Sequence, residues 1–323
     1  MQIARILIVR LGAMGDIIHT LPALATLRHA FPWAEIAWVV DTKWRPLLDG
    51  NPAVDQVIAG AGWRGLRAAR YDLVLDFQGL TKSAIIARLA RSKRLAGFRN
   101  SRETPAAWFY TEKAVTHAIH MVEQNIDLAI AAGASERVQA FPLPPGIPEG
   151  VLPAEFVLAS PLAGWGAKQW PLDYYSAVGE RLRREHGLTL VLNGPEAITV
   201  PHTLAHVSGL AGLIDATRRA SAVIGLDSGP LHLAAALGKT GVAIYGPTDP
   251  ARNGPYGGAF KVLRDAGAIT SHKRVQQPAA SMRAISPDAV YRALEPVLKD
   301  LKCPHSNNTP TSSPNYASPA AFS

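Results

Sequence analysis

The stretch "ARILIVRLGAMGDIIHTLPAL", residues 4–24, combines the three features that decide the fold. Its first seven residues form an apolar, β-branched run, which predicts a buried strand at 4–10. Gly12 and Gly15 then predict a tight turn, and the residues after them predict a helix near 17–30. A buried strand that leads through a glycine turn into a helix is the repeating unit of parallel α/β proteins.

The same alternation of short apolar runs and longer amphipathic stretches continues along the chain and predicts an α/β fold. In the first half it predicts strands at 36–40, 54–59 and 72–76 and helices near 80–92 and 119–132. In the second half it predicts strands at 156–160, 188–192, 205–208, 222–226 and 241–245, with helices near 172–184, 211–220, 229–237 and 286–301. Ser286 is expected to cap the last helix, with Pro287 just inside it.

A proline-rich stretch, "FPLPPGIPEGVLPAEF" at 141–156, separates the two series. Proline lacks a backbone N–H and fixes φ, so neither a helix nor an interior strand continues through this stretch. A chain of 323 residues also exceeds the size at which single cores usually stop growing. We therefore predict two doubly wound domains, at 1–145 and 146–302, and expect the Ser- and Pro-rich residues 303–323 to be disordered.

Composition excludes several classes of protein. The single cysteine, Cys303, lies in the polar tail, so a disulfide framework and a thiolate metal site are excluded. No apolar run approaches the roughly 18 to 20 residues of a membrane span, and the chain enters "ARILIVR" without a signal-peptide pattern. We expect a cytoplasmic protein.

Positive charge is concentrated in one window. The net charge is +8, and residues 60–102 hold ten Lys or Arg against two Asp, so the rest of the chain is balanced. A local basic stretch suggests an anionic partner, such as a nucleic acid, a membrane surface or a charged small molecule. A solvated basic face is the alternative.

Four turns at the ends of predicted strands carry polar residues, and ligands of parallel α/β sheets bind at that edge. In the first, Asp16 is either a helix N-cap or a general base. The turn does not match G-x-G-x-x-G, which leaves a nicotinamide-dependent dehydrogenase weakly supported.

The second and third turns offer groups for a nucleotide. In "SPLAGWGAKQWP", 160–171, small residues such as Gly164 let backbone N–H groups approach a ligand, and Lys168 adds a charge suited to phosphate. In "LNGPE", 192–196, Glu196 could accept hydrogen bonds from ribose hydroxyls. A solvated surface lysine and a solvated loop acid are the alternatives.

The fourth turn lies in "GLDSGPLHLAAALGK", 225–239, and is followed by the tight turn "GPTDP". The helix start at Ser228 and Gly229 offers unpaired N–H groups to a diphosphate. His232 follows within one turn and is either a donor to that group or a satisfied core residue. Asp227 would repel phosphate, so we expect it to face sugar hydroxyls or to orient the loop.

Five motifs in this order, "LGAMGDIIHTLPAL", "DFQGLTKSA", "AKQWP", "GLDSGPLHLAAALGK" and "YGPTDPARNGPYG", resemble the ADP-heptose lipopolysaccharide heptosyltransferases of glycosyltransferase family nine. The resemblance covers roughly residues 3–300. It implies a GT-B architecture, in which two Rossmann-like domains face each other across a cleft. The N-terminal domain would bind the acceptor and the C-terminal domain the nucleotide sugar.

The resemblance also implies site residues and partners. Asp16 would be the general base and Lys168 the catalytic lysine at the phosphates, in an inverting, metal-independent transfer without a cofactor. The partners implied are an ADP-sugar, a Kdo-lipid A acceptor and the inner membrane surface, and no nucleic acid. The donor would be bound by Gly164, Lys168, Glu196, Asp227, Ser228, Gly229 and His232, and the acceptor by Arg64, Arg67, Gln78, Lys82 and Arg102.

Rival functions are a nucleotide-sugar epimerase, a transferase for another nucleotide sugar, a nucleic-acid-binding module and a dehydrogenase. An epimerase would not need the basic window. The window lacks the interleaved aromatic residues that stack on nucleic-acid bases.

Overall fold

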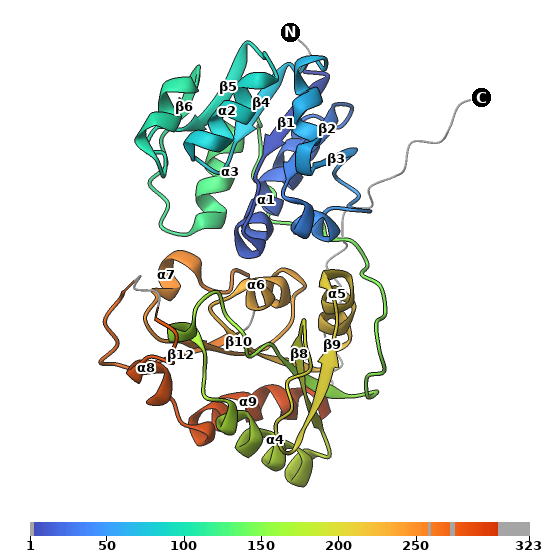
Figure 1. The fold of residues 1–323 in the computed structure, drawn as a ribbon, viewed down its shortest axis with the longest axis vertical. Helices are drawn as coiled ribbons and strands as arrows, with labels where there is room; N and C mark the ends of the chain where they lie inside the picture. The colour runs from blue at the N-terminus through green and yellow to red at the C-terminus, as the bar shows by residue number, and fades with distance from the viewer. Residues whose placement is uncertain (1–2, 258–259, 272–274, 303–323) are drawn as a thin grey trace, which may run out of the picture.

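The computed structural model describes residues 3–257, 260–271 and 275–302. They form two α/β halves, each built on one six-stranded sheet (Figure 1). The predicted tail, 303–323, lies outside the described residues. Residues 134–155, which connect the halves and include the proline-rich stretch, contain no helix or strand. The predicted domain boundary at 145/146 falls in this connection, and the domain limits stay a prediction.

The N-terminal sheet has the order β3-β2-β1-β4-β5-β6 and all its strand pairs are parallel. Its strands are β1 (Arg5–Val9), β2 (Glu35–Val40), β3 (Gln56–Ala59), β4 (Leu73–Asp76), β5 (Arg94–Phe98) and β6 (Glu112–Ala114). Its helices are α1 (Met14–Ala30), α2 (Thr81–Leu89) and α3 (Met121–Ala131), with the 3-10 helices η1 (Thr42–Leu47), η2 (Gly60–Arg67) and η3 (Thr104–Phe109).

The C-terminal sheet repeats this topology with the order β12-β11-β10-β7-β8-β9, again all parallel. Its strands are β7 (Phe156–Ala159), β8 (Thr189–Gly194), β9 (Thr203–Val207), β10 (Ala222–Leu226), β11 (Gly241–Tyr245) and β12 (Phe260–Arg264). Its helices are η4 (Gly166–Lys168), α4 (Leu172–His186), α5 (Leu210–Arg219), α6 (Gly229–Ala236), α7 (Pro250–Asn253), α8 (Ala280–Arg283) and α9 (Pro287–Lys302).

Alternating side chains of each central strand pack on opposite faces of its sheet. In β1, Ile6 and Ile8 join the core beneath α1 and α3, whereas Leu7 and Val9 join the core beneath η2, α2 and η3. Burial on both faces explains why the central strands are continuous apolar runs in the sequence. The first core continues into the C-terminal half through residues of α5 and α6, so the halves share apolar contact.

The prediction of two doubly wound parallel sheets is confirmed, while β5, β6 and β12 were not predicted. These strands lie at or next to sheet edges and carry polar or glycine residues, which weakens the apolar signal. The capping of α9 is confirmed, because Ser286 Oγ accepts a hydrogen bond from the Ala289 N–H at 3.2 Å.

In each sheet the chain reverses its direction of winding between two central strands, β1 and β4 or β7 and β10. Ligands of doubly wound proteins bind outside the carboxyl ends of the strands at such a switch point. The predicted turn at 11–16 follows β1, and the motif "DFQGLTKSA", which carries part of the family resemblance, follows β4. The predicted turns at 160–168 and 227–232 follow β7 and β10. The topology therefore places four motifs at the two switch points.

Candidate active site between the two sheets

The starts of α1 and α6 touch each other across the two halves (Figure 1). A Cβ atom on Gly15 would lie 2.6 Å from Cδ2 of His232, and one on Gly229 would lie 2.5 Å from Sδ of Met14. Neither glycine can carry a side chain unless its neighbour moves. The first and fourth predicted motifs therefore form one site, although more than 200 residues separate them in the sequence.

Asp16 lies in the first turn of α1 and is not its N-cap. The helix begins at Met14, about one turn before the predicted start, and Ala13 occupies the N-cap position. Gly15 is part of the helix and does not mark a turn. Its missing side chain leaves room for His232. Asp16 Oδ2 accepts a hydrogen bond from the Ala13 N–H at 3.3 Å, so the carboxylate still stabilises the helix start.

Arg10 holds the other oxygen of this carboxylate. Its Nη2 lies 3.0 Å from Asp16 Oδ1; the Arg10 side chain is 5% exposed and that of Asp16 is 33% exposed. The carboxylate is thus fixed in orientation and still open to solvent on one side. Arg10 was not predicted, although a charged residue at the end of a buried strand requires a partner.

Lys168 and Asp227 form a buried ion pair on the C-terminal side of the site. Their side chains are 13% and 7% exposed, and Nζ also lies 3.4 Å from the backbone oxygen of Asp227 and 4.1 Å from the ring centre of Trp165. The pair joins the loop after β7 to the loop after β10. The predicted contacts of Lys168 with phosphate and of Asp227 with sugar hydroxyls stay predictions.

The start of α6 presents unpaired backbone donors. Ser228 occupies the N-cap position, but its Oγ is directed to the Leu226 carbonyl at 3.3 Å and does not cap the helix. Within the described part of the chain, the N–H groups of Ser228 and Gly229 have no protein acceptor. Together with the positive end of the helix dipole, they can bind an anion.

Three histidines form a cluster between the halves. The ring of His19, from α1, lies 4.3 Å from that of His232 and 5.5 Å from that of His120, which caps α3. Burial lowers the pKa of His232 to about 4 and also lowers the pKa of His19 and His120, so all three rings are neutral at pH 7. His232 Nε2 lies 3.8 Å from Asp227 Oδ1. His19 and His120 were not predicted, because neither lies in one of the turns that the sequence singled out.

The remaining predicted donor residues lie nearer the surface. Gly164 is exposed with open space where a Cβ would lie, and Glu196 is exposed just after β8. In the loop that contains Gly164, the crowded glycine is Gly166, where a Cβ would lie 1.6 Å from the Gln276 carbonyl oxygen. Gly166, which was not predicted, is therefore the residue that fixes the loop.

Two kinds of residue occur among the predicted acceptor residues. Gln78 is half-buried, and its Oε1 accepts the Leu11 N–H at 2.7 Å, which ties the loop after β4 to the loop after β1. Asp76 is fully buried beside it and binds Ser83 and Tyr110. The basic members are all exposed and lie on or beside the layer formed by η2, α2 and η3: Arg64, Arg67, Lys82 and Arg102.

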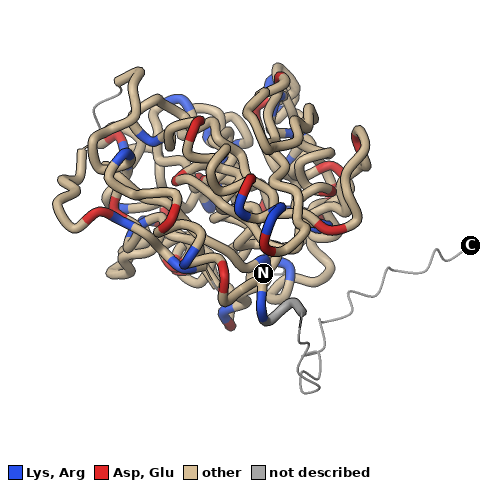
Figure 2. Tube along the Cα trace, turned by 90° about the horizontal axis from the view of Figure 1, so that it is seen from below, with Lys and Arg blue, Asp and Glu red and all other residues tan. Residues whose placement is uncertain are grey.

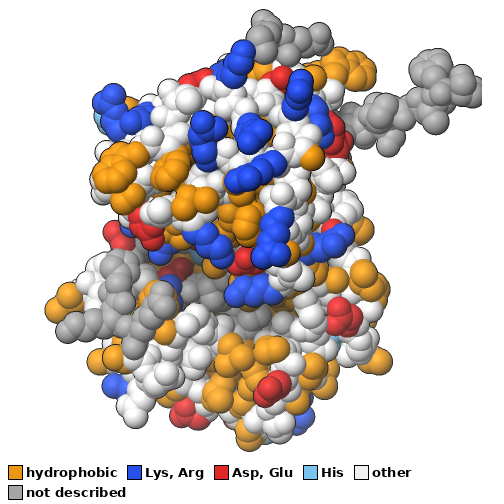
Figure 3. Space-filling view, turned by 45° about the horizontal axis from the view of Figure 1, so that its top comes forward, with side chains coloured by type: hydrophobic (Ala, Val, Ile, Leu, Met, Phe, Trp, Pro, Cys, Tyr) orange, Lys and Arg blue, Asp and Glu red, His pale blue; other side chains and the backbone are white. Residues whose placement is uncertain are grey.

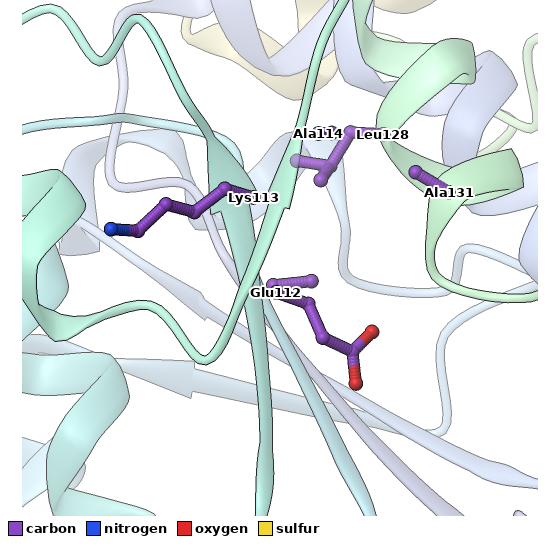
Figure 4. Close-up of a pocket in the computed structure, with 6 residues that line it drawn as sticks. Glu112, Lys113, Ala114, Leu128 and Ala131 are labelled. Carbon is purple, nitrogen blue, oxygen red and sulfur yellow. The ribbon is translucent and has the colours of Figure 1, made fainter.

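The pocket in Figure 4 lies outside this site. It has a volume of about 190 Å³ and lies between edge strand β6 and the C-terminal part of α3, lined by Glu112, Lys113 and Leu128 among others. Leu128 lies eight residues beyond His120, or about 12 Å along the helix. In Figure 4 Lys113 points to the opposite side of the strand from Leu128.

No group of three or more His, Cys, Asp or Glu side chains suited to a metal ion occurs in the part of the chain that the structure describes. Among the same residues, no helix is both long and apolar enough to cross a bilayer.

The comparisons with known proteins agree with this arrangement. Residues 60–281 match glycosyltransferase family 9 (heptosyltransferase). Lipopolysaccharide heptosyltransferase 1 of Pseudomonas aeruginosa is 30% identical over 300 aligned positions, which cover 78% of this chain and 81% of that protein. The chain therefore belongs to glycosyltransferase family 9 and is a glycosyltransferase of the GT-B type.

Two solved structures extend the likeness over nearly the whole chain. The Escherichia coli heptosyltransferase WaaC with ADP has a TM-score of 0.74 and 25% identity, and the alignment covers 91% of this chain and 99% of that one. The same enzyme with ADP-2-deoxy-2-fluoro heptose gives a TM-score of 0.71 and 25% identity, covering 89% and 98%.

We predict that Gly15→Ala lowers the free energy of unfolding by about 1 to 3 kcal/mol, because the new methyl group forces α1 and α6 apart. Helix propensity alone predicts the opposite sign. Urea denaturation measures the change, with Gly65→Ala as the control, since a Cβ at Gly65 meets nothing within 4 Å. An increase in stability at Gly15 would contradict the close contact.

Stability should also fall as the pH decreases from about 6.5 toward 4. In this range the unfolded chain protonates His232, whose ordinary pKa is about 6.5, whereas the folded chain excludes the proton because its pKa is about 4. Between pH 7.5 and 5.5 we expect His232→Gln to lose about 1 kcal/mol less than the wild type. The exposed residue His117 provides the control variant His117→Gln. Equal losses in all three proteins would refute the assignment.

Proposed function

We propose that this chain transfers heptose from ADP-heptose to the Kdo region of the lipopolysaccharide inner core. The observation that carries the proposal is the contact of Gly15 with His232, which joins the acid-bearing loop of one sheet to the helix start of the other. The sequence motifs most resemble those of heptosyltransferase I. The related E. coli enzyme was solved with ADP, which supports an ADP-sugar as donor.

The residues support a single displacement with inversion. The acceptor hydroxyl oxygen attacks the anomeric carbon, Asp16 takes the hydroxyl proton, and the bond to the diphosphate oxygen breaks so that ADP leaves with the electron pair. Arg10 keeps the Asp16 carboxylate in a fixed orientation. Such positioning removes the need to order the base during the reaction.

The leaving group would be stabilised from the C-terminal half. The N–H groups of Ser228 and Gly229 and the ammonium of Lys168 can meet the negative charge that develops on the diphosphate. His232 is neutral and buried next to them and can donate a hydrogen bond without adding charge. These groups supply the stabilisation that a metal gives in other sugar transferases, so we propose a metal-independent reaction without a cofactor.

We propose that the enzyme acts at the cytoplasmic face of the inner membrane and binds there as a peripheral protein. The acceptor, a Kdo-lipid A, carries carboxylates and phosphates and is anchored in the bilayer. The family match favours transfer over epimerisation, dehydrogenation or nucleic-acid binding. The direct test is incubation with ADP-heptose and Kdo-lipid A, where mass analysis should show the gain of one heptose.

Asp16→Asn should lower turnover by about 100-fold or more while donor affinity stays nearly constant, because the base acts on the acceptor proton. Asp41→Asn is the matched control, since Asp41 is exposed and follows β2 at the same edge of the sheet. Turnover and ADP-heptose binding are measured on each variant. Parallel losses of both in Asp16→Asn would assign this residue to helix stability instead.

Acceptor binding should weaken with salt, because free ions screen charges over about 8 to 10 Å. The triple replacement of Arg64, Arg67 and Lys82 by Ala should raise the acceptor KM, flatten its salt dependence and leave ADP-heptose affinity unchanged. The matched control replaces three exposed arginines of the other half: Arg183, Arg184 and Arg292. A wild-type acceptor KM in the first variant at low salt would place the acceptor elsewhere.

A further inference from the structure

The outer side of the N-terminal half carries apolar side chains that the proposed chemistry does not use. Trp108, on η3, is 76% exposed and Ile85, on α2, is 47% exposed. Lys82, Ile85 and Arg88 follow one another at a spacing of three, so they share one face of α2, and all three are exposed. We call the surface formed by Lys82, Ile85, Arg88, Arg102 and Trp108 the α2–η3 face.

This face is rigidly attached to the sheet. The Glu103 carboxylate, one residue before η3, accepts the Thr81 N–H at the start of α2 at 2.8 Å. Ser83 of α2 and Tyr110, just after η3, both donate to the buried Asp76 at 2.8 Å. The exposed side chains of Trp108 and Ile85 therefore belong to elements that hydrogen bonds hold in place on the sheet.

The charge around these apolar groups is strongly positive. Residues 79–111 contain seven Lys or Arg and one acidic residue, Glu103. Figure 3 shows Lys and Arg side chains gathered over the N-terminal half with hydrophobic side chains among them. The rest of the chain carries a net charge of only +2, and Figure 2 shows both kinds of charged residue along the trace.

Exposed tryptophan and isoleucine within a basic surface match the chemistry of a bilayer interface. An indole ring lies favourably at the level of the lipid headgroups, with its apolar body toward the acyl chains. Lys and Arg beside it attract anionic headgroups, while their aliphatic stems lie along the apolar boundary. A nucleic acid would instead require several aromatic residues along a groove.

We propose that the α2–η3 face docks on the surface of an anionic lipid bilayer, with Trp108 and Ile85 inserted among the headgroups. This inference extends the proposed function. It rests on that function for its explanation of why docking is useful. Lys82 and Arg102 belong both to this face and to the predicted acceptor site. Docking would therefore hold the loops after β4 and β5 at the surface in which a lipid-anchored acceptor lies.

The test is sedimentation of the full chain with vesicles that contain neither acceptor nor donor. We expect binding to phosphatidylcholine vesicles with about 30% phosphatidylglycerol, little binding to phosphatidylcholine alone, and weaker binding at high salt. The double variant Trp108→Ser, Ile85→Ser should bind the anionic vesicles at least 5-fold more weakly. Trp33→Ser is the matched control, because Trp33 is 84% exposed in the turn between α1 and β2, at the opposite edge of the sheet.

Wild-type binding by the double variant, or an equal loss in Trp33→Ser, would overturn the proposal. So would failure of the wild type to bind anionic vesicles, and the face would then suit a protein partner. Unfolding midpoints of all variants verify that they are folded. Because vesicle binding needs no transfer reaction, a failure of the proposed function would show only in the heptose assay.

If both proposals hold, the double variant should keep its activity on a soluble acceptor without acyl chains. It should lose activity on an acceptor embedded in vesicles, by a factor similar to its loss of vesicle binding. Equal activity of wild type and double variant on the embedded acceptor would show that docking by this face is not used.

Discussion

The close approach of two helix starts, each with a glycine against a side chain of the other, is the constraint on which the site depends. Gly15 lies against His232 and Gly229 against Met14, so a larger residue at either glycine would force its neighbour to move. This contact aligns the carboxyl edges of the two sheets toward each other. Each half contributes one part of the proposed site: the Asp16 carboxylate on one side and the helix start with unpaired N–H groups on the other.

The buried arginine and the largely buried lysine of the site each have a carboxylate partner. Arg10 pairs with Asp16, Lys168 pairs with Asp227, and the histidines stay neutral. Buried ion pairs contribute little net stability, because desolvation offsets their attraction. Their value here is orientation, since each pair fixes a reactive side chain to a neighbouring loop. A diphosphate that enters this site meets donors that are already in place.

The sequence predicted the parts of the fold that depend on local patterns. Strands β10 and β11 were predicted at their observed limits, because both are fully buried runs with turns on either side. The predicted start of α1 was wrong, because a glycine near a strand end is typical of a turn. Here Gly15 is helical, and only the position of His232 in the other half explains it.

The unpredicted site residues share one cause. His19 and Gly166 have roles defined by partners far away in the sequence, His232 and Gln276, and the role of Arg10 is defined by Asp16 on the other side of a turn. A local pattern reports burial and propensity but does not identify such partners. Arg10 was the easiest of the three to predict, since a guanidinium at the end of a buried strand requires a nearby anion.

The two halves share one topology and differ in surface charge, and in the proposed function this difference gives them separate tasks. The topology gives each half a switch point, and the contact between α1 and α6 turns the two switch points into one site. The excess of positive charge lies in the window 60–102, which belongs to the N-terminal half. In the proposed reaction, attraction of a large anionic surface would therefore act on that half, while the C-terminal half would bind the donor diphosphate through backbone N–H groups and one paired lysine. A ligand held by enclosed groups is screened little by salt, whereas one held by exposed arginines is screened strongly. The same fold used twice can thus separate a small charged donor from an extended anionic acceptor.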